Sequence, residues 1–179
     1  MKVGAIFFSS PRNPGFYSRA VKYFTKSKWS HCFYVGPAYM GELMAIETDL
    51  KLQVVPFQKE YVEKNEDVYE AFYPQMASSV DVLNAAKLAF RETAGQTYGF
   101  LSIPWFAVRA KLGHLFSFKK NYSTSGAICS ELLVKYIRAL GGEYEKCVSH
   151  LTDDETSPED LYTIVLSRQD LFKRIGENA

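Results

Sequence analysis

The stretch that decides the fold is residues 123–142, STSGAICSELLVKYIRALGG. Apolar residues recur in it at helical spacing from Leu132 to Leu140, and two glycines follow. This pattern predicts a helix that begins near Cys129, packs one face on the core and ends at the glycines. A thiol in the first turn or two of a helix feels the positive end of the helix dipole and unpaired backbone N–H groups, which lower its pKa. Cys129 is therefore either a nucleophile or a small apolar side chain of a core helix.

The composition suits one compact domain over residues 1–179. Of the 179 residues, 47% are hydrophobic, and no compositional break marks a linker. The 21 Lys and Arg residues balance 20 Asp and Glu residues without a block of like charge, so nucleic-acid binding is not expected. Three cysteines are too few for a disulfide scaffold and favour a reducing compartment. No signal peptide or membrane-spanning segment is recognisable, so we expect a cytoplasmic protein.

Short apolar runs and amphipathic segments make up the rest of the chain. Strands are expected at residues 3–9, 29–36, 43–48, 50–56 and 67–73. Further helices are expected at residues 16–28, at residues 80–94 with Ser79 as N-cap, and from Ser157 onward. Short turns, such as Gly36-Pro37, predict an antiparallel meander. Residues 100–120 are aromatic-rich and irregular, and we interpret them as an insertion that packs on the core, in preference to a lid or a membrane-contacting segment.

His31 is the histidine best placed to serve Cys129 as a base. It opens the expected strand at residues 29–36, whereas His114 and His150 fall in segments where a loop position is expected. If Gly36 pairs with Glu42 in a hairpin, His31 lies opposite Glu47, and directly opposed side chains share a face. A carboxylate there can hold the second nitrogen of the imidazole. A pairing shifted by two residues places Asp49 opposite instead, so Asp49 is the alternative orienting group.

The other two cysteines are expected to play structural roles. By strand alternation Cys32 points to the opposite face from His31, which predicts a core position. Cys147 lies in the polar stretch EYEKC, without a helix start or a cluster of positive residues. The cysteines and histidines lack the paired close spacing of structural zinc sites, so neither a metal nor another cofactor is expected.

Several short motifs together resemble the circularly permuted papain-like amidases, the YiiX/YaeF-like branch of the NlpC-type cysteine hydrolases. The motifs are SKWSHCFYVG at residues 27–36, AIETD at 45–49, GQTYGF at 95–100, AICSELLVKYI at 127–137 and TSPEDL at 156–161. The Cys-Ser-Glu-Leu block with an upstream Ser-His is the most specific of them. Papain-like enzymes usually carry Cys before His, and the reversed order here is what permutation implies.

The resemblance implies an α+β fold, with a small antiparallel sheet or partial barrel that carries His31 and Glu47 and a Cys129 helix packed across it. It also implies a cysteine amidase or peptidase. Cys129 would attack a carbonyl as thiolate, His31 would transfer the proton and Glu47 would fix the imidazole tautomer. The backbone N–H of Cys129 would hold the oxyanion in part. Trp29, two residues before His31, is a candidate substrate-binding wall of the groove or a core residue.

The resemblance leaves two other functions open. Lipid acyl hydrolases and acyltransferases of the lecithin:retinol acyltransferase type are relatives, and the aromatic segment from Phe100 to Phe118 could contact a membrane surface or an acyl chain in such an enzyme. The Cys-Ser-Glu-Leu block and the acidic third residue favour the amidase, acting on a peptide-like or acylated small substrate. The third function is a non-catalytic binding module. The absence of export signals and wall-binding modules favours a cytoplasmic bacterial or virus-encoded protein, and no obligate protein partner is inferred.

Overall fold

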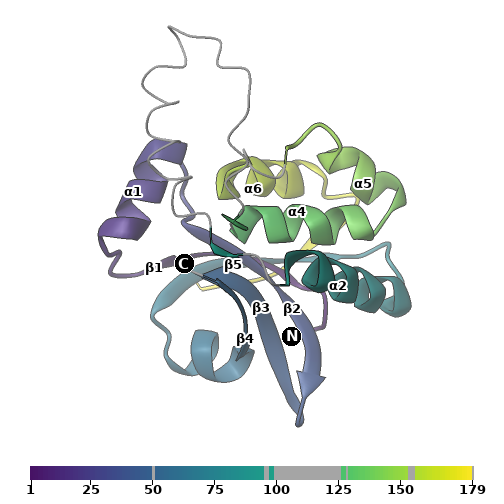
Figure 1. Cartoon of the computed structure of the whole chain (residues 1–179), viewed down its shortest axis with the longest axis horizontal. Coiled ribbons are helices and arrows are strands. Elements are labelled where there is room, and N and C mark those ends of the chain that lie inside the picture. The colour runs from purple at the N-terminus through teal and green to yellow at the C-terminus, as the bar shows by residue number, and fades with distance from the viewer. Residues whose placement is uncertain (50, 95–96, 99–125, 128, 153–155, 179) are drawn as a thin grey trace, which may run out of the picture.

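The computed structural model describes residues 1–49, 51–94, 97–98, 126–127, 129–152 and 156–178. It is an α+β structure in which one sheet carries helices on its faces (Figure 1). The strands are β1 (Ile6–Pro11), β2 (His31–Tyr39), β3 (Glu42–Asp49), β4 (Lys51–Pro56), β5 (Asp67–Pro74), β6 (Thr97–Tyr98), β7 (Gly126–Ala127) and β8 (Phe172–Glu177). The helices are α1 (Phe16–Thr25), the π-helix η1 (Gln58–Glu63), α2 (Ser79–Thr93), α4 (Cys129–Ala139), α5 (Gly142–Val148) and α6 (Pro158–Ser167).

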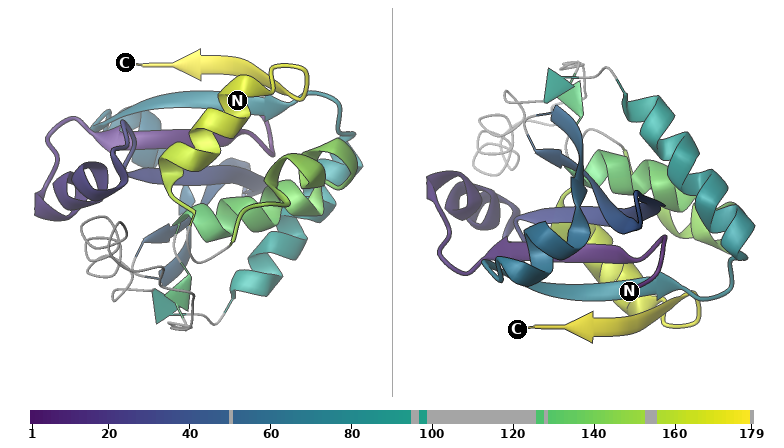
Figure 2. Two further views of the ribbon diagram at one scale, coloured as in Figure 1. Left: turned by 90° about the horizontal axis from the view of Figure 1, so that it is seen from above. Right: turned by 90° about the horizontal axis from the view of Figure 1, so that it is seen from below.

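The sheet has the strand order β7-β6-β4-β3-β2-β1-β5-β8. Neighbours run antiparallel, except β6 and β7, which are parallel. The edge strands β7 and β8 are not paired with each other in the described residues, so the sheet is open and the partial barrel is not formed. Helices α2, α4, α5 and α6 lie on one face, and η1 packs on the other (Figure 2). The predicted antiparallel α+β architecture is therefore confirmed.

Two hydrophobic clusters form the core, one on each face of the sheet. On the helical face, Tyr34 of β2 stacks on Tyr136 of α4 with ring centroids 4.5 Å apart. On the face of η1, Phe7 of β1 stacks on Phe33 of β2 at 4.9 Å. Strand alternation sends successive side chains to the two clusters, which is why residues 6–8 of β1 and 32–35 of β2 are continuously apolar.

The helix α4 forms as the apolar spacing predicts. Cys129 is its first described residue, and most of its side chains are buried between α2 and β2. The hydroxyl of Tyr136 donates a hydrogen bond of 3.0 Å to the carbonyl of Gly4, which ties α4 to the start of the chain. Gly4 has a φ of 85°, and a Cβ there would meet Val82 at 2.1 Å. The helix is thus fixed along its length, and Cys129 is held at its beginning.

The strand β2 does not stop at Gly36-Pro37 as predicted. It continues to Tyr39 with a register shift between Val35 and Ala38 that accommodates the proline, which has no N–H to donate. The turn that follows is Met40–Gly41, whose φ angles of 51° and 86° suit a two-residue hairpin loop. The predicted pairing of Gly36 with Glu42, which implies a loop over residues 37–41, is therefore wrong, because Glu42 pairs with Tyr39.

The longer strand changes the register that governs the site. Tyr34 pairs with Ile46, and extending this pairing sets Glu47 opposite Phe33 instead of His31. Backbone pairing between β2 and β3 ends at Tyr34 and Ile46. Among the described residues, the part of β2 before Tyr34 pairs with β1, and the part of β3 after Ile46 pairs with β4. The two strands part here. The observed register differs from the predicted one by two residues. The side chain of Glu47 therefore still lies on the same face of the sheet as that of His31, as its diagonal neighbour.

Other predicted boundaries also need correction. The N-cap of α2 is Ser78, not Ser79, because Ser78 and Asp81 form a reciprocal capping box. The sequence analysis missed α5, which begins directly at the second glycine after α4 and carries Cys147. The segment from Phe100 to Phe118 lies outside the described residues, as does His114. Within the described residues, no helix is both long and apolar enough to cross a membrane.

Candidate active site

The candidate active site lies where β2 and β3 part and α4 begins. Cys129 is at the start of α4, and its surface is 6% exposed. His31 is the first residue of β2, and its side chain is 20% exposed. Glu47 lies near the end of β3. The structure thus brings the three residues predicted from the sequence to one place, although their catalytic roles stay predictions.

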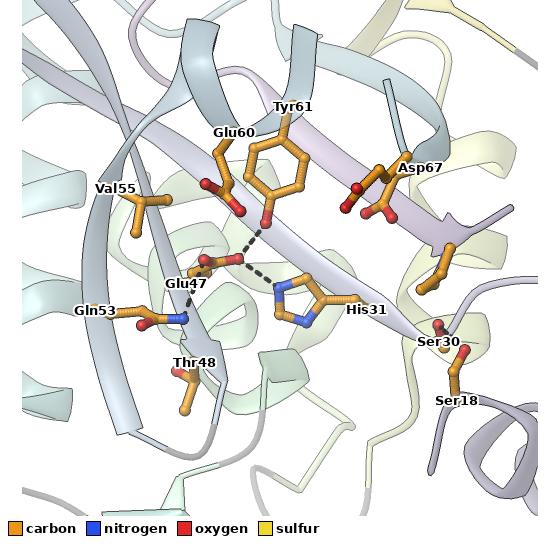
Figure 3. A pocket seen from close by; sticks show the side chains of 12 residues that line it. Ser18, Ser30, His31, Glu47, Thr48, Gln53, Val55, Glu60, Tyr61 and Asp67 are labelled. Carbon is orange, nitrogen blue, oxygen red and sulfur yellow. Dashed lines mark hydrogen bonds and ion pairs between the residues drawn. The ribbon is translucent and has the colours of Figure 1, made fainter. Parts of the chain in front are cut away.

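His31 contacts Glu47 directly. The imidazole Nε2 lies 2.9 Å from Oε2 of the carboxylate, and a carboxylate oxygen there assigns the donor role to Nε2–H (Figure 3). The other ring nitrogen, Nδ1, is then left for the hydrogen bond between His31 and Cys129. The imidazole therefore bridges the carboxylate and the thiol.

Two further side chains hold the Glu47 carboxylate in place. The hydroxyl of Tyr61, on η1, donates to Oε2, and the amide of Gln53, on β4, donates to Oε1 at 3.2 Å (Figure 3). Burial alone would raise the pKa of Glu47, but the hydrogen bonds from His31, Tyr61 and Gln53 and the charge of His31 lower it. Burial and the charge of Glu47 raise the pKa of Tyr61, which keeps its hydroxyl a donor. The sequence analysis missed Tyr61 and Gln53.

The thiol and the imidazole shift each other's pKa in opposite directions. A hydrogen bond from the Cys32 thiol, and then the hydrogen bond and charge of His31, hold the pKa of Cys129 well below its usual value against the effect of burial. Burial lowers the pKa of His31, but hydrogen bonds to Cys129 and Glu47, with their charges, raise it well above its usual range. The arrangement favours a thiolate–imidazolium pair near neutral pH.

Cys32 has a role that the sequence analysis did not foresee. As predicted, it is fully buried on the helical face, away from the face of His31. That face is where Cys129 lies, and both the thiol and the backbone N–H of Cys32 donate hydrogen bonds to Cys129. Burial and the charge of Cys129 raise the pKa of Cys32, so Cys32 stays protonated and acts as the donor. Cys129 is thus held between two consecutive residues of β2.

Trp29 takes the core position of the two that the sequence left open. It is fully buried in the helical-face cluster and packs edge-on against Tyr162 of α6 with ring centroids 5.6 Å apart. The prediction of a groove wall assumed that Trp29 belongs to the same strand as His31. Since β2 begins at His31, strand alternation does not determine the direction of the Trp29 side chain. Trp29 does not line the pocket described below, and its substrate-binding role stays a prediction that no observation here supports.

The remaining candidates lie away from the site or outside the description. The Cys147 thiol on α5 donates to the carbonyl of Tyr144 at 2.9 Å, and His150 is exposed after the same helix. The side chain of Asp49, the alternative orienting group, lies outside the described residues, as does all of His114. Of the described side chains, Glu47 is the carboxylate that contacts His31.

A pocket of about 360 Å³ opens beside His31 and Glu47 (Figure 3). It lies at the end of the sheet where β1 ends and β2 and β5 begin, and α1 contributes one wall. Its lining residues are Pro11, Ser18, Ser30, His31, Glu47, Thr48, Gln53, Val55, Glu60, Tyr61, Glu66 and Asp67. The pocket is large enough for a small ligand or a few residues of a peptide.

Comparison with known proteins identifies a solved structure with the same fold. No protein-family model matches the chain, and no curated protein matches its sequence. Among solved structures, the crystal structure of metalloprotein yiiX from Escherichia coli O157:H7, DUF1105, superposes with a TM-score of 0.60 and 14% sequence identity, over 99% of this chain and 97% of that one. The chain has a YiiX-like fold. At this identity the likeness to YiiX concerns the fold alone.

The described residues of this chain do not fit the metal that the description of YiiX implies for that protein. No group of three or more His, Cys, Asp or Glu side chains among them is arranged to hold a metal ion. In the candidate site, His31 is engaged with Glu47 and Cys129, and both oxygens of Glu47 already accept hydrogen bonds. The chemistry of this site is therefore derived from the side chains alone.

Proposed function

We propose that the protein is a cysteine hydrolase, an amidase or peptidase, that acts by thiolate acyl transfer on a peptide-like or acylated small substrate. The observation that carries the proposal is the position of His31, whose imidazole contacts the Cys129 thiol and the Glu47 carboxylate. A nucleophile, a base and a group that orients the base are the parts that catalysis by cysteine requires. The lowered pKa of Cys129 supports a nucleophilic thiolate.

In the first half of the reaction, the Cys129 thiolate attacks the carbonyl carbon of the amide, and the carbonyl oxygen becomes an oxyanion. The first N–H groups of a helix have no acceptor within the helix, so the backbone N–H of Cys129 can stabilise this charge. One such donor is typically worth about 3 kcal/mol in the barrier. His31 then gives its proton to the leaving nitrogen, the C–N bond breaks, and a thioester on Cys129 remains.

In the second half, neutral His31 takes a proton from a water molecule, which attacks the thioester. The thiolate leaves, the acid product departs, and His31 is again an imidazolium. Glu47 accepts a hydrogen bond from Nε2–H in both halves, which keeps Nδ1 directed at the reacting atoms. Tyr61 and Gln53 are positioning residues, because they hold the carboxylate that orients His31. A reducing compartment such as the cytoplasm keeps the three free cysteines as thiols.

The test is the rate of alkylation of each cysteine by iodoacetamide against pH, read by mass spectrometry, in wild type and His31→Ala. Because His31 lowers the pKa of Cys129, we expect wild-type Cys129 to react at an almost constant rate from about pH 8 down to about pH 6. In His31→Ala the rate at pH 6 should fall by about two orders of magnitude as the pKa moves toward 8.5.

Cys147 is the internal control, because its thiol lies on α5 and contacts none of the site residues. Burial raises the pKa of Cys147, so its alkylation should slow steadily below pH 8 in both proteins. If Cys129 has the same pH profile as Cys147, or keeps its profile without His31, the proposed nucleophile is rejected.

A further inference from the structure

The pocket beside His31 has an unbalanced charge. Among the described residues that line it, four are carboxylates and none is Lys or Arg. Glu47 is matched by His31, and Glu60 is matched by Lys64, whose ammonium lies 2.5 Å from its Oε1. Glu66 and Asp67 have no ion pair with any of the described residues. In the described part of the chain, the pocket therefore holds two carboxylates that no Lys, Arg or His contacts as an ion pair.

Asp67 is the more enclosed of these two carboxylates. It is the first residue of β5, is partly buried, and lies across the pocket from Glu47 (Figure 3). Burial raises the pKa of Asp67, the charge of His31 and a hydrogen bond from Ser9 offset this only in part, and the charges of Glu47 and Glu66 raise the pKa further. A cation that enters the pocket would stabilise a carboxylate placed at this cost beside other carboxylates.

A hydroxyl in the same pocket also lacks a partner. Thr48 lines the pocket and is 2% exposed, and its Oγ1 has no hydrogen-bond partner among the described residues. A buried hydroxyl without a partner destabilises the folded state, because the water that it bonds in the unfolded chain is not replaced. A ligand with several N–H donors can satisfy the carboxylates and donate to the Thr48 hydroxyl as well, whereas an anionic ligand, which only accepts, can satisfy the hydroxyl but not the carboxylates.

The position of the pocket relates it to one part of the substrate. In the proposed reaction His31 gives its proton to the leaving nitrogen, so the leaving amine must lie against the imidazole. His31 is a wall of the pocket, and Cys129 is not among its lining residues. The pocket thus lies on the side of the leaving amine and not on the side of the acyl group.

We propose that this pocket binds a positively charged group on the leaving amine, so that the substrates are amides of cationic amines, such as diamines or the basic residues of a peptide. The inference rests on the proposed function for its account of which substrate end lies in the pocket. The charge of the leaving group, supplied by an alkylammonium or a guanidinium, would be matched by Asp67 and Glu66, which form no ion pair with the described residues.

The first experiment measures binding and needs no turnover. The Cys129→Ser protein is titrated with 1,4-diaminobutane, with 1,4-butanediol and with succinate, and the backbone amide signals of pocket residues are followed by NMR. We expect the diamine alone to shift the signals of Tyr61 and Asp67. In the Glu66→Gln/Asp67→Asn double variant the dissociation constant should rise about tenfold, because two attractive charges are removed.

Glu60→Gln is the matched control within the same pocket, because the charge of Glu60 is already neutralised by Lys64. Its effect on diamine binding should be twofold at most. The single variant Glu66→Gln changes an exposed residue and covers the case in which the double variant does not fold. Equal binding of the three ligands, or diamine binding that is unchanged in the double variant and in Glu66→Gln, overturns the inference.

The second experiment compares turnover of N-acetyl-1,4-diaminobutane and N-butylacetamide, which differ in the terminal ammonium. We expect the cationic amide to have a kcat/KM about tenfold higher, and this ratio to fall toward one in the Glu66→Gln/Asp67→Asn variant. Diamine binding that depends on Asp67, together with an unreactive Cys129, would reject the proposed function and leave the pocket assignment standing. A reactive Cys129 without charge preference would reject the pocket assignment alone.

Discussion

Two buried carboxylates in this molecule, Glu47 and Glu70, are held by opposite kinds of partner. Glu70 is 2% exposed and accepts from Lys28 at 2.7 Å, from Arg174 at 2.8 Å and from Tyr162 at 3.0 Å. These partners come from the segment before β2, from β8 and from α6. Two permanent cations and a phenol therefore satisfy Glu70 and tie three segments to β5.

Glu47 is 5% exposed and also accepts from a tyrosine, but it has no Lys or Arg partner in the described part of the chain. Its cationic partner is His31, whose charge depends on a proton that it can give away. Burial is similar in the two networks, and each carboxylate accepts a hydrogen bond from a tyrosine, so neither feature distinguishes them. What distinguishes them is a partner that can titrate and whose second nitrogen faces a thiol.

The largest expected difference between the two networks is in reactivity. In Glu47→Gln the imidazole loses the acceptor that fixes its tautomer and stabilises its charge, so we expect turnover to fall on the order of a hundredfold or more. Alkylation of Cys129 at pH 6 should also slow, because the pKa of His31 drops and the thiolate is less stabilised. The measurements are kcat/KM with an amide substrate and the alkylation profile.

Glu70→Gln is the matched control, since it makes the same chemical change in the other network. We expect alkylation and turnover within twofold of wild type and a loss of about 1–3 kcal/mol in the free energy of unfolding, measured with urea. The loss is smaller than for a fully buried pair because Lys28 and Arg174 are about half exposed. If Glu47→Gln loses only stability and Glu70→Gln loses reactivity, the distinction drawn between the networks is wrong.

A smaller effect is expected from the tyrosine of the site. Tyr61→Phe removes one donor from Glu47 while His31 and Gln53 remain, so the carboxylate is less firmly placed. Turnover should fall by about threefold to tenfold, which is the range for the loss of one hydrogen bond of ordinary strength, because two other donors still hold the carboxylate. The acid limb of the kcat/KM profile should move to higher pH, because a weaker Glu47–His31 contact lowers the pKa of His31 and raises that of Cys129. A change in stability without this movement would make Tyr61 a structural residue only.

The smallest expected effect is on stability at the pocket. The raised pKa of Asp67 means that its ionised form costs the folded state free energy above the unfolded pKa of about 3.9. Asp67→Asn should therefore raise the free energy of unfolding by about 0.5 kcal/mol at pH 7, and the gain should disappear as the pH falls below 4. Urea denaturation at pH 7 and pH 3.5 checks this, and a loss of stability at pH 7 would show that Asp67 has a structural partner.

The sequence predicts the parts of the site that depend on periodicity. The 3.6-residue spacing after Cys129 places the thiol at a helix start, and strand alternation places His31 and Glu47 on one face. The predicted hairpin register was wrong, yet the contact forms because an error of two residues preserves the face. An error of one residue would have moved Glu47 to the other side of the sheet.

The parts that could not be predicted depend on contacts between distant segments. Tyr61 reaches Glu47 from the π-helix η1, a rare element that has no recognisable sequence pattern. Cys32 meets Cys129 only because α4 packs on the helical face of β2, which strand alternation does not reveal. Trp29 lies in the core because the strand begins two residues after it.

The distribution of the site along the chain has a consequence for the newly made protein. His31 and Glu47 belong to one hairpin and are 16 residues apart, whereas Cys129 arrives about a hundred residues later on a helix that must dock on β2. Among the described residues, the side chains that lower the pKa of Cys129 most, those of Cys32 and His31, both lie on β2. Until α4 docks, the pKa of the Cys129 thiol is that of an ordinary cysteine. The reactive thiolate therefore forms only when folding is complete, and Cys129 of a nascent or misfolded chain is not readily acylated.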